Sequence, residues 1–141
     1  MIKRGSESCV NAQKFLLRIP VSGAAETVPV PEGILPPELP ASLLQTDVTE
    51  RYRVPVMPEA LQDAFVLCYL IDARGGERSL PVNFIGTCFY HTGCPIYGDL
   101  LLCACTDEHG DEAVSGLTAE QTDLLRQWLA AQFPEYSGVQ L

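Results

Sequence analysis

The sequence has little positive charge, and its second half has almost none. It contains 9 lysine and arginine residues against 18 acids, which gives a formal net charge of −9. After Arg78 the one basic residue is Arg126. The acids of the same half are Asp99, Asp107, Glu108, Asp111, Glu112, Glu120, Asp123 and Glu135. Because nucleic-acid-binding proteins hold phosphates with clustered lysine and arginine, we expect no direct nucleic-acid binding.

Long apolar runs are also missing. No run approaches the length of about 20 residues that a membrane-spanning helix needs. The first residues, 1–8, have no apolar stretch after Lys3 and Arg4 of the kind that a secretory signal has. We therefore expect a cytoplasmic protein without a membrane partner. Its 141 residues fit a single domain, 1–141, with a flexible start at 1–13.

Disulfides are not needed, because a chain of this length buries a sufficient core and we find no export signal. The cysteines are Cys9, Cys68, Cys88, Cys94, Cys103 and Cys105. We expect all of them to be reduced thiols. Cys68, Cys103 and Cys105 lie in apolar runs, where a free cysteine packs as a small hydrophobic side chain.

Apolar runs predict strands at 14–19, 64–71 and 96–106. The last two runs are apolar at both alternating positions, which is typical of central strands that are covered on both faces. Gly75 and Gly76 predict a turn after the second run.

Residues 79–85 are expected to pair back after this turn as the second arm of a hairpin, and residues 86–95 are expected to be irregular. Residues 58–62 predict one helical turn that begins with a proline.

Prolines dominate residues 28–40. They remove backbone donors and fix φ, so we interpret 28–40 as a proline-rich extended connector without regular structure. A polyproline ligand for a partner's groove is the alternative, because Pro37 and Pro40 have the P-x-x-P spacing.

The last element is a helix. Thr118 and Gln121 have the spacing of a capping box, and apolar residues recur at helical spacing from Leu124 to Phe133, before Pro134 ends the helix. We expect an α+β fold: a mostly antiparallel sheet with a C-terminal amphipathic helix packed on one face.

Three short motifs resemble a known family. They are Leu80-Pro81-Val82-Asn83, Ile96-Tyr97-Gly98-Asp99 and the Leu117-Thr118 pair that opens the final helix. From residue 64 to 133 the chain is similar to a small uncharacterised domain family of phages and conjugative elements of Gram-positive bacteria, the domain of unknown function 3846 type. That family often has Asn-Arg at Asn83-Phe84, so no role for the arginine carries over. The resemblance implies a mobile genetic element as context and implies no mechanism.

Both histidines lie among the cysteines. Cys88-x-x-His91-x-x-Cys94 and Cys103-x-Cys105-x-x-x-His109 offer the sulfur and nitrogen ligands that zinc prefers. The common C-x-x-C spacing is missing, however, and Cys103 and Cys105 are expected to face the same core layer. We favour packed thiols and expect no cofactor. Metal binding remains the alternative, with the candidates Cys88, His91, Cys94, Cys103, Cys105 and His109.

Cysteine catalysis is not favoured. A pair such as Cys88 or Cys94 with His91 needs a nearby cation or a helix N-terminus to lower the thiol pKa, and Arg126 is the one fixed cation of this half.

Two carboxylates deserve comparison with catalytic acids. Asp72 and Asp99 each border a central strand, where burial perturbs carboxylates, but acids at strand ends are more often turn-forming or solvated. Residues 107–112 lack the spacing of a calcium loop, and no phosphate-binding loop or Ser-His-Asp pattern is present. No catalytic or cofactor-binding residue is assigned.

Three functions stay open at this point. The favoured one is a non-enzymatic accessory or protein-interaction domain of a mobile genetic element, with protein partners of unknown identity. The first alternative is a small metal-binding or thiol-dependent enzyme that uses Cys88, His91, Cys94 and Asp99. The second is an acidic, antirestriction-like mimic of nucleic acid, which the excess of acids after Arg78 suggests. The sequence does not predict an oligomeric state.

Overall fold

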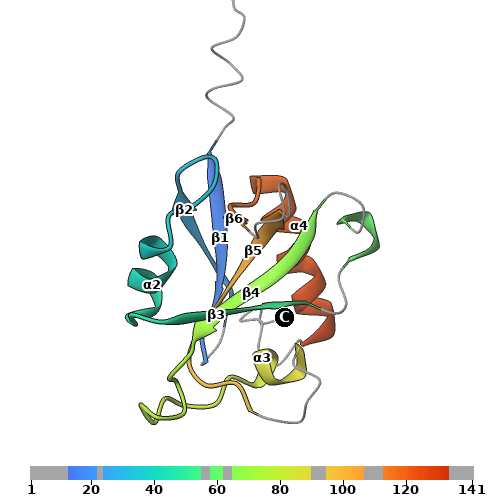
Figure 1. The fold of residues 1–141 in the computed structure, drawn as a ribbon. Coiled ribbons are helices and arrows are strands. Elements are labelled where there is room, and N and C mark those ends of the chain that lie inside the picture. The colour runs from blue at the N-terminus through green and yellow to red at the C-terminus, as the bar shows by residue number, and fades with distance from the viewer. Residues whose placement is uncertain are drawn as a thin grey trace, which may run out of the picture.

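The structure is a computed structural model, and it describes residues 13–21, 24–54, 58–61, 65–89, 95–106 and 113–133. Figure 1 shows one twisted sheet with helices on both faces. The elements in chain order are β1 (Lys14–Ile19), β2 (Glu26–Val30), α2 (Glu38–Leu44), β3 (Thr49–Arg53), the 3-10 turn η1 (Glu59–Leu61), β4 (Val66–Asp72), α3 (Phe84–Phe89), β5 (Leu100–Thr106), β6 (Ala113–Ser115) and α4 (Ala119–Gln132).

The sheet has six strands in the order β2-β1-β5-β4-β3, and β6 pairs with the end of β5, beyond the residues of β5 that pair with β1. Neighbouring strands are antiparallel in every described pairing. The α+β class and the mostly antiparallel sheet are therefore confirmed. The two runs that were predicted to be central strands, β4 and β5, lie side by side at the centre, with Cys68 opposite Cys103.

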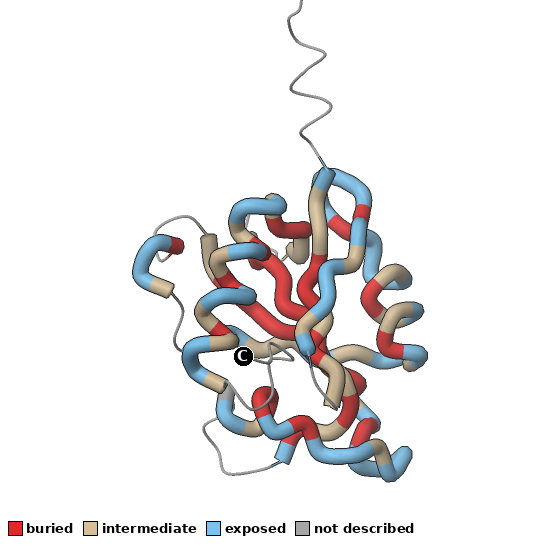
Figure 2. The backbone as a smooth tube through the Cα atoms, turned by 180° about the vertical axis from the view of Figure 1, so that it is seen from behind, coloured by how far each residue is buried: buried red, intermediate tan, exposed pale blue. Residues whose placement is uncertain are grey.

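Alternation along the central strands divides the core into two layers. Leu100, Leu102 and Ala104 of β5 pack in the layer that α4 covers with Leu125 and Leu129. The residues between them, Leu101, Cys103 and Cys105, face the layer that contains Leu35 and Leu44. Figure 2 shows the buried residues concentrated along these central strands. The prediction that Cys103 and Cys105 share a core layer is confirmed.

The predicted capping box of α4 is confirmed. Thr118 Oγ1 accepts a hydrogen bond from the Gln121 N–H at 3.0 Å, and Gln121 Oε1 accepts one from the Thr118 N–H at 2.9 Å. These two bonds satisfy backbone donors that the first turn leaves without helical partners. The helix then lies across the sheet on its apolar stripe.

The prediction of irregular structure throughout 28–40 is wrong. Pro29 lies in β2, which is an edge strand, so its missing N–H removes no bond to an outer neighbour. Pro40 lies in the first turn of α2, where the N–H groups have no helical acceptor. The polyproline alternative is also wrong, because Pro37 has the helical angles φ −60° and ψ −24° and Pro40 is buried.

The predicted hairpin arm at 79–85 is wrong as well. Within it, Val82 forms one isolated β-bridge, to Tyr97, and α3 starts at Phe84. Asn83 explains the difference, since its side-chain oxygen accepts the Gly86 N–H at 2.9 Å and so caps the helix. Residues 86–89, predicted to be irregular, are the rest of α3, whereas 90–94 lie outside the described residues.

Gly86 allows α3 to approach the sheet closely. A Cβ at this position would lie 2.8 Å from a Leu100 methyl group and 3.0 Å from a methyl group of Ile96. Among the described residues, no helix has both the length and the apolar character needed to cross a bilayer.

Candidate functional site

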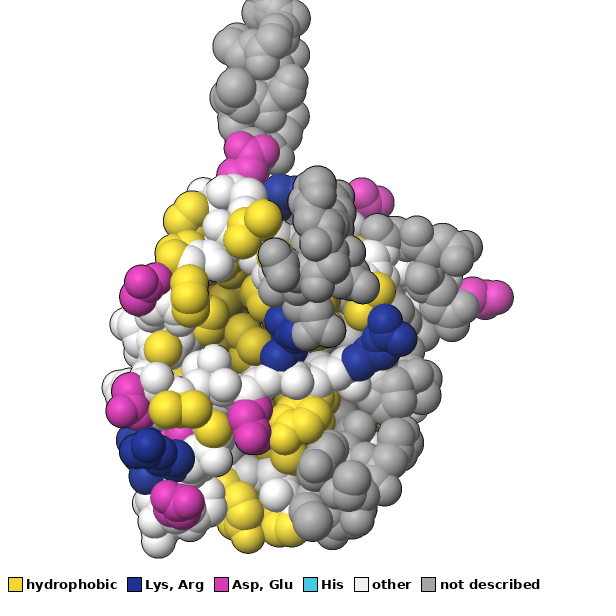
Figure 3. Space-filling model, in the orientation of Figure 1, with side chains coloured by type: hydrophobic (Ala, Val, Ile, Leu, Met, Phe, Trp, Pro, Cys, Tyr) yellow, Lys and Arg dark blue, Asp and Glu magenta, His cyan; other side chains and the backbone are white. Residues whose placement is uncertain are grey.

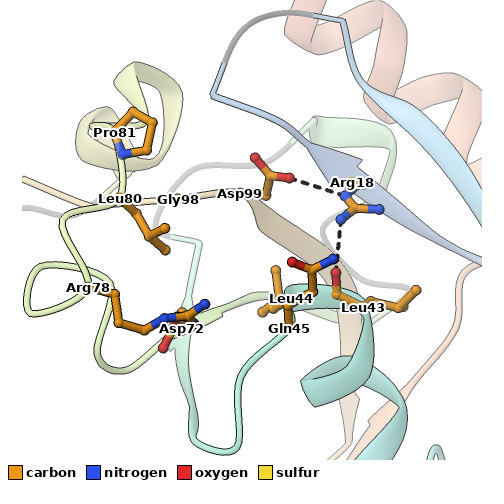
Figure 4. Close-up of a pocket in the computed structure, with 10 residues that line it drawn as sticks. All are labelled: Arg18, Leu43, Leu44, Gln45, Asp72, Arg78, Leu80, Pro81, Gly98 and Asp99. Carbon is orange, nitrogen blue, oxygen red and sulfur yellow. Dashed lines mark hydrogen bonds and ion pairs between the residues drawn. The ribbon is translucent and has the colours of Figure 1, made fainter.

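A pocket of about 270 Å³ lies between β1, the C-terminal end of α2, the turn after β4 and the start of β5 (Figure 4). Four charged side chains line it: Arg18, Asp99, Arg78 and Asp72. We call it the Arg–Asp pocket. Its remaining wall is largely apolar, from Leu43, Leu44, Leu80 and Pro81.

The first ion pair joins β1 to the start of β5. Arg18 Nε lies 3.3 Å from Asp99 Oδ2, and Arg18 Nη2 donates to the Leu43 carbonyl of α2 at 2.8 Å. Asp99 Oδ1 also accepts the Val21 N–H at 3.1 Å. Arg18 therefore connects the sheet to α2 on the face that this helix covers.

The second ion pair, Arg78 with Asp72, lies at the end of β4. The turn after β4 brings Arg78 back over Asp72, because the Arg78 N–H donates to the Arg74 carbonyl at 2.9 Å. The Asp72 side chain is 2% exposed. Its Oδ1 accepts hydrogen bonds from the Thr46 hydroxyl at 2.8 Å and the Arg74 N–H at 2.9 Å, and Arg78 donates to Oδ2, so both oxygens of the buried carboxylate have partners.

Unusual backbone conformations gather around the pocket. In the described part of the chain, the non-glycine residues with positive φ are Gln45 (58°) and Ser79 (59°). Gln45 lines the pocket, and Ser79 lies between Arg78 and Leu80, which also line it. Gly98, another lining residue, has φ 85°. Left-handed backbone at a residue other than glycine is disfavoured by about 1–2 kcal/mol, and it is often found where a site must be shaped.

The helix α2 also borders two other hollows. One, of about 620 Å³, adjoins the Arg–Asp pocket through Gln45 and Arg78 and includes Ser42. The other is a groove of about 490 Å³ at the N-terminal end of α2, where Pro37 and Pro40 line it. We call it the apolar groove, and its lining includes Ile34, Leu35, Pro37, Pro40, Leu70 and Val114. Figure 3 shows hydrophobic side chains gathered on this face of the molecule, and Ile34 is 70% exposed.

The described thiols are unpaired: Cys68, Cys103 and Cys105 are buried, and Cys88 is exposed. Burial raises the pKa of Cys68 from 9.0 to about 12, with Cys105 beside it as a further cause. Burial also raises the pKa of Cys103 well above 9.0. A raised thiol pKa keeps these groups neutral and unreactive near neutral pH.

The three metal candidates that the structure describes are not all together. Cys103 and Cys105 lie in the core layer beneath α2, whereas Cys88 lies on α3, which packs on the other layer through Ile85. His91, Cys94 and His109 lie outside the described residues. Within the described ranges, no three histidine, cysteine or acidic side chains are placed to hold a metal ion.

Sequence reasoning named two of the four charged pocket residues. Asp72 and Asp99 were considered because they border central strands, and both line the same pocket. Arg18, Arg78 and Gln45 were missed. Arg18 carried a signal, since it is a basic residue inside an otherwise apolar strand sequence, Phe15 to Ile19.

No protein-family model, curated protein or solved structure matches this chain.

Proposed function

We propose that the chain is a non-enzymatic protein-interaction domain that binds its partner around α2. The observation that carries this proposal is the position of α2 between the apolar groove and the charged Arg–Asp pocket. An apolar surface beside a few converging polar groups is the usual composition of a recognition site. The strongly exposed Ile34 at the groove is the side chain best placed to be covered by a partner.

The pairing of the charges supports binding rather than proton transfer. A general acid or base must reach the proton of the substrate with its own oxygen or nitrogen. Both oxygens of Asp72 and both oxygens of Asp99 instead accept hydrogen bonds from the protein itself, including one from an arginine guanidinium in each case. The buried thiols have raised pKa values, which disfavours the thiolate nucleophile.

The biological context is part of the same proposal. We propose an accessory role in a mobile genetic element, which the family resemblance supports, and a cytoplasmic location, which the unpaired described thiols support. Genes for phage or conjugation functions beside this gene are the expected finding. A gene neighbourhood of unrelated metabolic enzymes in several genomes would count against the context but not against the binding role.

Site-specific photo-crosslinking in the producing cell tests the interaction. A photo-reactive amino acid replaces Ile34 at the apolar groove, Ser42 beside the Arg–Asp pocket, or Glu120 as the control. Glu120 is exposed on α4, which covers the opposite sheet face. We expect the same adduct from positions 34 and 42 and none from position 120. Equal labelling from all three positions, or none from 34 and 42, would contradict the proposal.

A further inference from the structure

We infer that the Arg–Asp pocket binds a carboxylate group. This inference rests on the proposed function and deepens it, because it names the chemical group that the partner presents to the pocket.

The acceptors of the pocket are already engaged. Asp72 accepts from Thr46, Arg74 and Arg78, and both of its oxygens are engaged. Asp99 accepts on both oxygens too, from Val21 and Arg18. Each of these oxygens accepts at least one hydrogen bond within the protein, so a ligand that approaches with donor groups finds only part of their acceptor capacity left.

The donors of the pocket are not all engaged. Arg18 uses Nε and Nη2 within the protein, which leaves the N–H groups of Nη1. Arg78 uses Nη1, and its Nε and Nη2 N–H groups have no acceptor among the described residues. Its side chain lines the pocket and is 39% exposed. A guanidinium with Nε and Nη2 available offers the two parallel donors that a carboxylate accepts.

Charge and size favour a carboxylate over a phosphate. The two arginines and two aspartates sum to zero, in a chain with a formal net charge of −9. A phosphate carries about −1.5 to −2 charges at pH 7 and meets more repulsion here than a singly charged carboxylate does. The volume of about 270 Å³ suits one small group. Leu43, Leu44, Leu80 and Pro81 offer contact to a short aliphatic stem.

NMR titration of the full chain tests the inference with a matched pair of probes. N-acetyl-leucine carries an aliphatic stem and a carboxylate, and N-acetyl-leucinamide carries the same stem without the charge. Inorganic phosphate is the third probe, and sodium chloride holds the ionic strength constant. We expect N-acetyl-leucine to produce saturable shifts of the arginine Nε–Hε signal of Arg78 and the amide signal of Gly98. N-acetyl-leucinamide and inorganic phosphate are each expected to bind at least about tenfold more weakly than N-acetyl-leucine.

Two variants connect the binding to the guanidinium. Arg78→Lys keeps the charge beside Asp72 but loses the planar fork, so we expect roughly tenfold to hundredfold weaker binding of N-acetyl-leucine. Arg126→Lys, an exposed substitution on α4, is the control and is expected to bind like the wild type. Amide spectra of both variants establish that they fold. Equal binding of acid and amide, tighter binding of phosphate, or unchanged binding by a folded Arg78→Lys would overturn the inference.

Further probes distinguish the source of the carboxylate. Propionate represents a free metabolite, N-acetyl-leucine a chain end, and the α-amide of N-acetyl-aspartate an acidic side chain. The tightest of the three identifies the source, whereas failure of all three overturns the inference. In that case adducts from positions 34 and 42 would leave the proposed interaction standing. If carboxylates bind but positions 34 and 42 give no adducts, the proposed protein partner is contradicted and the carboxylate site stands.

Discussion

Asp72 and Arg78 form an ion pair in which the carboxylate is almost fully buried, at 2% exposure, while the guanidinium is 39% exposed. Asp72 is held by hydrogen bonds from Thr46, Arg74 and Arg78. Arg78, in contrast, uses only Nη1 for its bond to Asp72 and keeps its other N–H groups for a ligand. This asymmetry makes Asp72 a positioning residue and Arg78 the candidate contact to a ligand.

Removal of Arg78 is expected to destabilise the fold. Arg78→Met leaves the Asp72 charge buried without its cation, so we expect a loss of about 2 kcal/mol in the free energy of unfolding, measured by urea denaturation. The double variant Asp72→Asn with Arg78→Met removes both charges and is expected to recover at least half of the loss. A single variant as stable as the wild type would show that the pair contributes little.

Gln45 and Ser79 both have left-handed backbone, so glycine variants at the two positions distinguish an effect on stability from an effect on ligand binding. Gln45→Gly relieves a disfavoured φ of 58°, and Ser79→Gly relieves one of 59°. Both are expected to raise the free energy of unfolding by about 0.5–1 kcal/mol. Gln45 lines the pocket and Ser79 does not, so only Gln45→Gly is expected to weaken binding of N-acetyl-leucine. Equal affinity in both variants would exclude a binding role for the Gln45 side chain.

The buried thiols predict a decline of stability at alkaline pH. Burial raises the pKa of Cys68 to about 12 and that of Cys103 well above 9.0, so the folded chain keeps protons that the unfolded chain releases. The contribution of these neutral thiols to the free energy of unfolding is therefore fully present below pH 9 and is lost as the pH rises from 9 towards 12. Urea denaturation at pH 8 and pH 10.5 measures this decline.

Cys103→Ala is the variant for this comparison. It removes one of the buried thiols, so the difference between the two pH values is expected to shrink, even though the cavity lowers stability at both. An identical difference in the variant and the wild type would assign the decline to other groups.

Asn83 is expected to be a structural residue. Its side chain is buried, donates to the carbonyls of Ile19 and Gly98 at 3.0 Å each, and caps α3 through Gly86. Asn83→Ala leaves these groups without partners, so we expect a loss of about 3 kcal/mol in thermal or urea unfolding. Gln127→Ala, at an exposed position of α4, serves as the control and is expected to change stability by less than about 0.5 kcal/mol.

The sequence predicted those parts of the fold that depend on residues close together in the chain. The apolar runs of β4 and β5 and the Thr118 capping box are visible in sequence because each depends on neighbours along the chain. The helix α2 and the turn into α3 were missed, since they depend on long-range facts. Pro29 is compatible with a strand only because β2 is at the sheet edge, and Asn83 caps a helix while it contacts Ile19, 64 residues away.

The sequence predicted the two acids of the Arg–Asp pocket but not its two arginines, because the ion pairs depend on contacts that the fold creates. Asp72 and Asp99 are marked by their positions at the ends of apolar runs. Their partners are not, because Arg18 is 81 residues from Asp99 and meets it only when β1 pairs with β5. Sequence alone therefore suggested isolated acids, whereas the fold places each beside a guanidinium.

A crystal structure of the protein with N-acetyl-leucine would show whether a carboxylate binds in the Arg–Asp pocket. We expect the ligand carboxylate in this pocket, with its oxygens about 2.7–2.9 Å from Arg78 Nε and Nη2, while Asp72 keeps its hydrogen bonds. Density for the ligand elsewhere, or a carboxylate that displaces Arg78 from Asp72 without contacting Arg18, would contradict this expectation.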